Sequence, residues 1–342
     1  MSLKRKSLAA AALFLLAATY NASAESYCEQ GKPLRLADVS WESGAFLTEL
    51  LTKIFGDGYG CEIEKVSGNS LIMSHALITG DIDIYPEQWV GRTEVMNKAR
   101  AEGTVRAAGH PYLDAREGWY VPDYVVNGDP ERGIEPLAPE LKSVEQLADP
   151  KIRALFSDPE EPSKGRFLNC PTGWSCERLN TAKLEGYGLD EYYTNFLPGS
   201  GAALDAEVAS SYLRKQPVLF YYWNPTALMG TYKLLQLEEP AYSDECWDGL
   251  TSSDPKTQAC AFPLGEVVYD VNVKFADQAP DIIEILSKAT IPLETINEAL
   301  AYMAKEKAEP ADAATWFLKN YAHLWTNWVS TEAAEKINQG LN

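Results

Sequence analysis

Hydrophobic and polar positions along the chain follow two alternating periods. Short runs rich in β-branched and aromatic residues are followed by longer segments in which apolar residues recur every three or four positions. In the first part of the chain this pattern predicts a strand, a helix, a strand, a helix and a strand: Leu34 to Val39, Gly44 to Phe55, Cys61 to Val66, Asn69 to Thr79 and Asp81 to Tyr85. A βαβαβ order predicts a parallel sheet covered by helices.

A second series of strands and helices follows a polar connection. A helix pattern at Thr93 to Glu102 and a strand pattern at Gly118 to Val126 precede the segment Asn127 to Pro139, which is rich in Gly, Pro and charge. Beyond it, strand and helix patterns alternate again: Arg166 to Asn169, Ser175 to Glu185, Tyr192 to Leu197, Gly201 to Lys215 and Pro217 to Tyr222. The last part adds a strand at Gly265 to Lys274 and three helices, Ala279 to Lys288, Leu293 to Lys305 and Ala311 to Leu324. The chain therefore predicts two α/β lobes.

The first residues have the pattern of a secretory signal peptide. Lys4, Arg5 and Lys6 are followed by the apolar run Leu8 to Ala18 and by Ala22-Ser23-Ala24, a small-residue cleavage signal. We expect residues 1–24 to be removed and the mature chain to be exported to the periplasm. No later apolar run reaches the roughly 18 residues that a membrane span requires, so we expect a protein that is not embedded in a membrane.

Composition narrows the class of protein. The 342 residues are 46% hydrophobic, which excludes an intrinsically disordered chain. Lys plus Arg number 30 against 49 Asp plus Glu, and the formal net charge is -19. Such a surface repels phosphate backbones, so a nucleic-acid partner is excluded.

The six cysteines all follow the predicted signal peptide, which fits disulfides in an oxidising compartment. Their order and spacing favour three pairs: Cys28 with Cys61, Cys170 with Cys176, and Cys246 with Cys260. Zinc binding is the alternative, but there is no Cys-x-x-Cys pair and the three histidines are isolated. We expect no metal and no cofactor.

Catalytic signatures are missing from the sequence. It contains no Gly-x-Ser-x-Gly elbow, no His-Glu-x-x-His motif, no phosphate loop and no dinucleotide fingerprint after a strand. The sequence therefore favours a protein without enzymatic activity.

The positions of the tryptophans are the most informative feature. Five of the nine fall at or near predicted strand ends or in turns between elements: Trp41, Trp89, Trp119, Trp174 and Trp223. Ligands of α/β proteins bind in the crevice beyond the carboxyl ends of the strands. Tryptophan faces that converge there would form a cage for a quaternary or trimethylated nitrogen, which is bound through ring quadrupoles rather than hydrogen bonds. The alternative for each single tryptophan is packing in the core.

Polar groups near these tryptophans could complete the site. The turn from Cys170 to Cys176 leads into a helix whose first N–H groups, at Ser175 and Cys176, would face whatever Trp174 touches. This is a carboxylate site or an ordinary capped helix start. The acids near the expected cage are Glu42, Glu87 and Asp123, any of which could balance a bound cation or lie solvated on the surface.

Three motifs resemble one protein family. They are Asp81 to Trp89 (DIDIYPEQW), Cys170 to Cys176 (CPTGWSC), and Pro217 to Pro225 (PVLFYYWNP) followed by Leu237 to Pro240 (LEEP). In this order they closely resemble the substrate-binding proteins of glycine betaine, proline and choline ABC transporters. The resemblance covers nearly the whole mature chain and implies a type II periplasmic-binding-protein fold, in which two lobes close on a ligand held between them.

The resemblance also implies roles for individual residues. The tryptophan box of the family falls on Trp89, Trp174 and Trp223, and the N–H groups of Ser175 and Cys176 are available for a ligand carboxylate. Trp41 matches an aromatic residue of choline-binding relatives, and Trp119 a further wall in relatives that bind trimethylamine N-oxide. Betaine-binding relatives place a histidine four residues after the first box tryptophan, where this chain has Thr93. The departure favours a methylated cation without a carboxylate, such as choline or trimethylamine N-oxide.

The complete expectation is a monomeric periplasmic protein that delivers this ligand to an ABC permease with a cytoplasmic ATPase, for osmoprotection or nutrition. We expect one lobe at residues 25–117 and 225–342 and the other at 118–224. An exported sensor module for the same ligands and an exported enzyme that acts on them are the alternatives.

Overall fold

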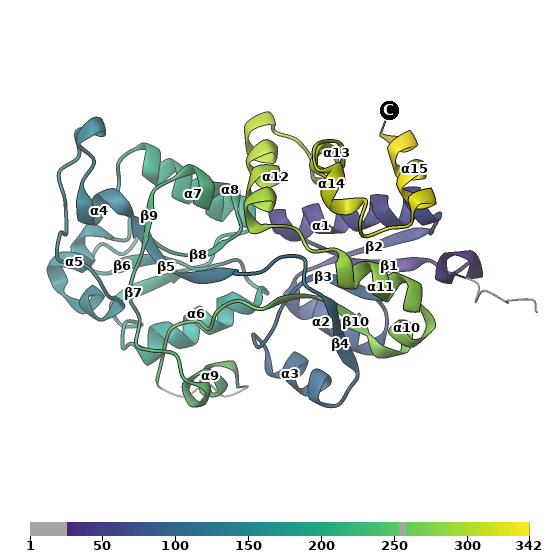
Figure 1. Ribbon diagram of the computed structural model, residues 1–342. Helices are drawn as coiled ribbons and strands as arrows, with labels where there is room; N and C mark the ends of the chain where they lie inside the picture. Colours follow the sequence, from purple (N-terminus) through teal and green to yellow (C-terminus); the bar gives the residue numbers. More distant parts are fainter. Residues whose placement is uncertain (1–25, 253–257, 342) are drawn as a thin grey trace, which may run out of the picture.

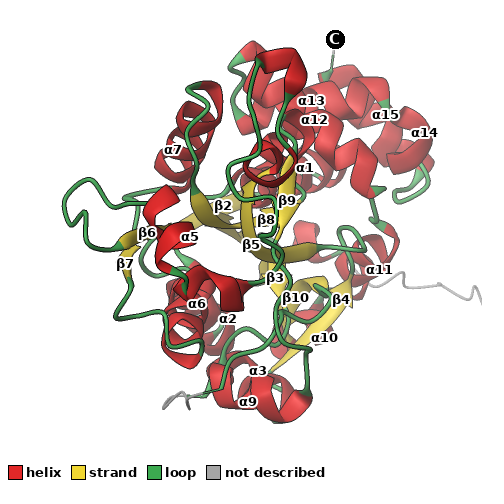
Figure 2. Ribbon diagram, turned by 90° about the vertical axis from the view of Figure 1, so that its left-hand side faces the viewer, coloured by secondary structure: helices red, strands yellow, loops and turns green. Residues whose placement is uncertain are grey.

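The computed structural model describes residues 26–252 and 258–341, which fold into two lobes lying side by side (Figure 1). Each lobe is built on one five-stranded sheet flanked by helices (Figure 2). The two-lobed α/β fold expected from the alternating patterns is confirmed. The predicted signal peptide lies outside the described residues. Within the described ranges, no helix has the length and apolar character needed to cross a membrane.

The first sheet has the strand order β2-β1-β3-β10-β4. Its strands are β1 (Leu34–Val39), β2 (Ile63–Gly68), β3 (Ile84–Trp89), β4 (Val105–Gly109) and β10 (Val267–Asn272). β1 pairs in parallel with β2 and β3, as the βαβαβ pattern predicts, whereas β10 runs antiparallel between β3 and β4. A late segment of the chain therefore completes the first lobe.

Helices cover both faces of this sheet. They are α1 (Glu42–Lys53), α2 (Ser70–Thr79), α3 (Glu94–Ala101), α10 (Val273–Gln278), α11 (Pro280–Lys288), α12 (Leu293–Glu306), α13 (Pro310–Asn320), α14 (Ala322–Trp325) and α15 (Thr331–Gly340). In Figure 1, α1 and α12 to α15 lie above the sheet, and α2 and α3 lie below it. Local signals set the ends of α2: the Asn69 side chain accepts the Ile72 N–H at 3.0 Å, and Gly80 ends the helix with φ 83°.

The second sheet has the order β7-β6-β8-β5-β9. Its strands are β5 (Arg116–Pro122), β6 (Gly165–Leu168), β7 (Tyr193–Phe196), β8 (Leu219–Asn224) and β9 (Leu234–Gln236). The helices of this part are α4 (Asp123–Asn127), α5 (Pro150–Leu155), α6 (Ser175–Gly186), α7 (Gly201–Leu213), α8 (Ala227–Thr231) and α9 (Asp244–Thr251). β6 pairs in parallel with β7 and β8, and β5 is antiparallel to β8 and β9.

The pattern predicted one strand over the apolar run from Gly118 to Val126. This prediction is wrong. β5 ends at Pro122, and the next residues form α4. Pro122 has no N–H to continue a strand ladder, and Asp123 places a carboxylate at the positive end of the new helix. These start signals outweigh the β propensity of Val125 and Val126.

Two adjacent segments connect the lobes. Ala115 and Gly265 form an antiparallel bridge, in which the Gly265 N–H donates to the Ala115 carbonyl at 2.9 Å. β9 pairs with β5 and so belongs to the second sheet, although it lies beyond the boundary expected near Asn224. We therefore propose that the return crossing between the lobes lies near Gly265.

The predicted cysteine pairs are all present in the structure. Cys28 bonds Cys61 in the first lobe, and Cys170 bonds Cys176 at the start of α6. The third pair, Cys246 with Cys260, ties α9 to the segment that leads back to the first lobe. Because all six cysteines are in disulfides, none is a free thiol that could bind zinc.

Candidate functional site

A small cavity lies between the lobes. Residues from both lobes line it: Trp41, Ser70, Trp89 and Arg92 from the first, and Glu117, Trp174, Ser175, Cys176, Tyr221 and Trp223 from the second. Four of the five tryptophans singled out from the sequence therefore meet in one place. Large aromatic faces dominate the lining, and charged groups are few.

The fold explains why these tryptophans converge. Trp41 follows β1 as the N-cap residue of α1, and Trp174 has the same place before α6, shortly after β6. Trp89 is the last residue of β3, and Trp223 lies near the end of β8. Because the carboxyl ends of parallel strands share one edge of a sheet, each lobe presents its tryptophans at the edge that faces the other lobe.

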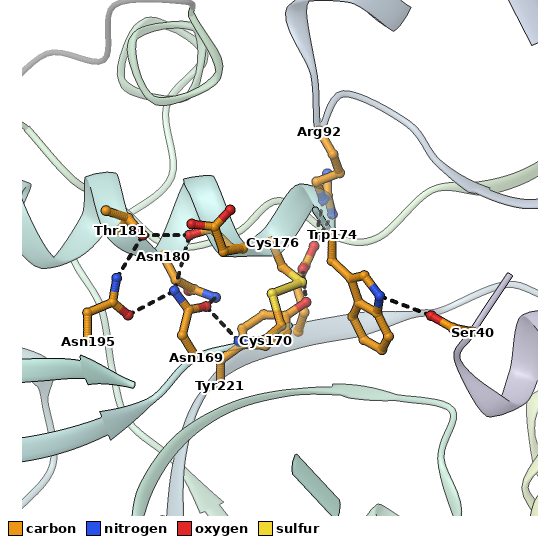
Figure 3. Close-up of a disulfide and its surroundings, with 12 residues drawn as sticks. Ser40, Arg92, Asn169, Cys170, Trp174, Cys176, Asn180, Thr181, Asn195 and Tyr221 are labelled. Atoms are coloured by element: carbon orange, nitrogen blue, oxygen red, sulfur yellow. Dashed lines mark hydrogen bonds and ion pairs between the residues drawn. A yellow bond between two sulfur atoms is a disulfide. The ribbon is translucent and has the colours of Figure 1, made fainter. Parts of the chain in front are cut away.

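Trp174 is the central ring of the cluster. Its centroid lies 5.4 Å from Trp41 and 5.5 Å from Trp223, with interplanar angles of 70° and 75°. Its indole N–H donates to the Ser40 hydroxyl at 3.2 Å, a hydrogen bond that joins the two lobes (Figure 3). The rings meet edge to face, so adjacent walls present faces in different directions, as a box around a small cation requires.

The turn that carries Trp174 is held by a disulfide and by hydrogen bonds of Asn169. Asn169 accepts the Cys170 N–H at 2.7 Å and the Asn180 amide at 3.0 Å, and its own amide donates to Asn195 at 3.0 Å (Figure 3). Gly173 has φ 88°, a conformation that other residues rarely adopt. Ser175 and Cys176, at the start of α6, line the cavity with N–H groups that have no acceptor inside the helix. This end of the cavity can bind an oxygen atom of a ligand.

A buried ion pair joins the lobes beside the tryptophans. Arg92 Nε donates to Glu117 Oε1 at 2.6 Å, and both side chains are 3% exposed. The Tyr221 hydroxyl donates to Glu117 Oε2 at 2.6 Å. The Arg92 guanidinium also lies 5.8 Å from the Trp89 ring centroid and 5.1 Å from that of Trp247. The charge of Glu117 is thus compensated within the protein.

Glu87 lies behind two of the cavity walls. Its Oε1 accepts the Trp41 indole N–H at 2.8 Å and the Trp89 indole N–H at 3.1 Å. Burial raises the pKa of this carboxyl group to about 6, although the hydrogen bonds that it accepts lower it. The residue is fully buried and does not itself line the cavity.

Trp119 is a core residue, contrary to its prediction as a cavity wall. It is 0% exposed, its indole N–H donates to Asn180 Oδ1 at 2.8 Å, and its ring lies 4.2 Å from that of Phe167. Tyr187, just beyond α6, packs edge-on against it at 5.5 Å. α6 therefore separates Trp119 from the cavity.

The core position of Trp119 can be tested with Trp119→Phe. We expect the free energy of unfolding to fall by about 1–3 kcal/mol, because Asn180 loses its donor and a void remains. Ligand affinity of the folded protein should change less than about twofold, since a ring that does not touch the ligand makes no cation–π contact with it. Urea unfolding and ligand titration measure the two quantities, and a large loss of affinity at unchanged stability would restore Trp119 as a wall.

Two of the predicted acids also lie outside the cavity. Glu42 lines a separate cavity together with Asp205, and burial together with the Asp205 carboxylate raises the pKa of Glu42 to about 7. Asp123 begins α4 and accepts a hydrogen bond from Asn127 at 2.7 Å on an exposed surface. Proximity in the sequence to Trp41 or Trp119 therefore did not place either side chain in the cavity.

Thr93 has a structural role at the position where betaine-binding relatives have a histidine. Its hydroxyl accepts the Met96 N–H at 3.4 Å and caps α3, and it does not line the cavity. Its neighbour Arg92 lines the cavity instead. The polar lining residues Ser70, Arg92, Glu117 and Tyr221 were not predicted from the sequence. No motif links Arg92 with Glu117, because only the packing of the lobes brings them together.

Comparison with known proteins identifies relatives over most of the chain. Residues 32–320 match the family described as the substrate binding domain of the ABC-type glycine betaine transport system. The glycine betaine/proline betaine-binding periplasmic protein of Escherichia coli is 25% identical over 202 residues, which cover 57% of this chain and 61% of that protein. The chain spans about three fifths of the length of the curated relatives that it matches.

Solved structures confirm the fold. The glycine betaine/L-proline-binding protein of Borrelia burgdorferi superposes with a TM-score of 0.70 at 18% identity and covers 90% of this chain and 100% of that one. An ABC-transporter choline-binding protein in complex with choline also reaches 0.70 at 18% identity, covering 91% of this chain and 98% of that one. At this level of identity the similarity concerns the fold.

Proposed function

Because this chain belongs to the family of substrate-binding domains of ABC-type glycine betaine transport systems, we propose that it binds a small methylated ammonium compound in the cavity between its lobes. The observation that carries the proposal is the convergence of Trp41, Trp89, Trp174 and Trp223 on one cavity. A trimethylated nitrogen has no N–H to donate, so aromatic faces are the side-chain surfaces best suited to it. The protein would pass its ligand to an ABC permease after export to the periplasm.

The tryptophans provide enough interaction energy for a useful affinity. Each desolvated cation–π contact contributes about 1–2 kcal/mol. Three or four such contacts, with one polar anchor at the start of α6, approach the roughly 8 kcal/mol that micromolar binding requires. Closure of the lobes excludes water from the cavity and strengthens each contact.

The polar lining favours a ligand without a carboxylate. Betaine-binding relatives hold the ligand carboxylate with a histidine, and Thr93 here caps a helix instead. The one arginine of the cavity is paired with Glu117, so it is not free to bind a carboxylate. The remaining N–H groups of Ser175 and Cys176 suit a hydroxyl or an N-oxide oxygen. We propose that choline or trimethylamine N-oxide binds more tightly than glycine betaine.

The proposal is tested by calorimetric titration of the mature protein with choline, trimethylamine N-oxide, glycine betaine, carnitine and proline. We expect saturable binding of choline or trimethylamine N-oxide with a Kd of roughly micromolar size. Glycine betaine should bind about tenfold or more weakly, since its carboxylate lacks a charged partner. Absence of binding by every methylated ammonium compound would overturn the proposed function, and tighter binding of glycine betaine would overturn the preference.

A further inference from the structure

Glu87 differs from the other buried acids of the protein. In its described part the structure buries five acidic residues and also the side chain of Glu239, and all of these except Glu87 pair with a cation: Asp83 with Arg35, Glu117 with Arg92, Asp158 with Arg166, Asp270 with Arg100, and Glu239 with Lys183. Glu87 is 0% exposed, it accepts hydrogen bonds from two indoles and from the Ser43 hydroxyl at 3.1 Å, and the Tyr112 hydroxyl interacts with the same carboxyl group. A buried carboxylate without a cationic partner is costly, and proteins rarely retain one.

The geometry shows where a compensating cation would lie. Both indole N–H groups that Glu87 accepts belong to cavity walls, Trp41 from the start of α1 and Trp89 from the end of β3. The carboxylate therefore stands at the N–H edge of two rings that line the cavity. An indole whose N–H donates to an anion has a more electron-rich face, and the full negative charge adds to the attraction of any cation beyond it.

We propose that Glu87 is the positioning and charge-compensating residue of the cage: its buried carboxylate orients Trp41 and Trp89 and gives the cavity its preference for a ligand with a net positive charge. The inference rests on the proposed function, because it assigns the missing cation to the ligand. No cationic side chain of the described residues pairs with Glu87, and its hydrogen-bond partners, the Tyr112 hydroxyl included, are uncharged, so the protein leaves the negative charge without a counter-charge.

The groups around Glu87 decide what a pH measurement reports. Three tyrosines face the carboxylate: Tyr85 on β3, Tyr112 from the connection after β4, and Tyr269 on β10. Burial raises the pKa of each of them, so none ionises near neutral pH. α1 contributes Ser43 and Trp41, which carry no charge.

Two ion pairs lie farther from the Glu87 carboxylate. Asp270 on β10 pairs with Arg100 at 2.7 Å, and burial raises the pKa of Asp270 to about 6. On the other side of Trp89 lies the Arg92–Glu117 pair. The Glu87→Gln variant retains both ion pairs. The difference between its pH profile of choline affinity and that of the wild type therefore reports on Glu87.

The test compares choline with 3,3-dimethylbutan-1-ol, the uncharged molecule of the same shape, on wild-type protein and on Glu87→Gln. Glutamine keeps an oxygen that can accept both indole N–H groups but removes the charge. We expect choline to bind the variant roughly tenfold or more weakly, while the Kd of the neutral analogue changes less than about threefold. Equal weakening of both compounds would show that Glu87 only shapes the cage, and would overturn the charge role.

The pH profile gives a second readout that needs no variant. A bound cation favours the ionised carboxylate, so the Kd of choline should rise about tenfold as pH falls from about 8 to about 5, through the Glu87 pKa of about 6. The neutral analogue should show no such rise, and Glu87→Gln should remove it for choline. A choline profile that is flat in wild-type protein would overturn the inference even if the variant does not fold.

The controls separate this inference from the proposed function. Glu266→Gln removes an equal charge from an exposed site just before β10, and we expect unchanged affinity for both compounds. If wild-type protein binds no methylated ammonium compound, the proposed function fails. If wild-type protein binds choline but Glu87→Gln binds it equally well at every pH, only the role of Glu87 fails.

Discussion

Trp174→Ala is expected to reduce choline affinity by about a hundredfold or more. Trp174 contacts both Trp41 and Trp223, so its removal opens the box on two sides at once. The lost cation–π contact contributes about 1–2 kcal/mol, and the neighbouring rings lose their desolvated packing as well, for a total near 3 kcal/mol. The hydrogen bond to Ser40 that helps to hold the lobes together is also lost. Calorimetric titration measures the change.

Trp316→Ala is the matched control for this substitution. Trp316 lies on α13 in the first lobe, where its ring stacks on Tyr302 at 5.0 Å, and it does not line the cavity. We expect it to lower stability while choline affinity stays within about twofold of wild type, because it makes no contact with the ligand. Wild-type affinity in folded Trp174→Ala protein would show that the tryptophan cluster is packing and would contradict the site described above.

Glu117→Gln is expected to weaken choline binding by about as much as Trp174→Ala, because it destabilises the closed arrangement of the two lobes. Arg92 comes from the first lobe and Glu117 from the second, and both are buried where the lobes meet. Removing the carboxylate leaves the guanidinium buried without a counter-charge, which costs about 3–5 kcal/mol. If opening of the lobes relieves this cost, the open form is favoured, and affinity falls because the ligand must supply the energy of closure. Small-angle scattering of the ligand-free variant should show a larger radius of gyration.

Two further variants test this explanation. Arg92→Gln combined with Glu117→Gln removes both charges, and we expect it to recover part of the lost affinity, because no uncompensated charge remains. Asp83→Asn breaks an ion pair within the first lobe, between a buried carboxylate and the partly exposed Arg35, and should lower stability with little effect on affinity. Loss of affinity without lobe opening in Glu117→Gln would mean that Glu117 acts on the ligand directly.

Much of the fold was predictable because its signals are local. β1 was predicted residue for residue, since Pro33 before it and the polar residue Ser40 after it leave few alternatives for the bounds of this short segment. The three disulfides followed from compartment and spacing. The run from Gly118 to Val126 was predicted wrongly, because β propensity competed there with the helix-start signals of Pro122 and Asp123.

The site was predictable where its residues stand at strand ends. Trp41, Trp89, Trp174 and Trp223 line one cavity, as the rule that α/β proteins form their crevice beyond the carboxyl ends of strands predicted, and their contact with a ligand stays a prediction. Trp119 was predicted wrongly, because the same rule does not say which residues a neighbouring helix covers. Glu117 and Trp119 are two positions apart on β5 and so point to the same face of the sheet, yet Glu117 lines the cavity and Trp119 lies against Asn180 of α6.

The sequence by itself determined the two α/β lobes, the paired cysteines and the tryptophans at the strand ends, because each depends on residue type and on spacing along the chain. Only the tertiary structure decided which charged side chains form ion pairs or hydrogen bonds with distant segments of the chain. The pairing of Arg92 with Glu117 and the shared use of Glu87 by Trp41 and Trp89 depend on how the lobes and sheets pack. These are contacts between surfaces, and the order of residues along one strand or helix does not encode its partner.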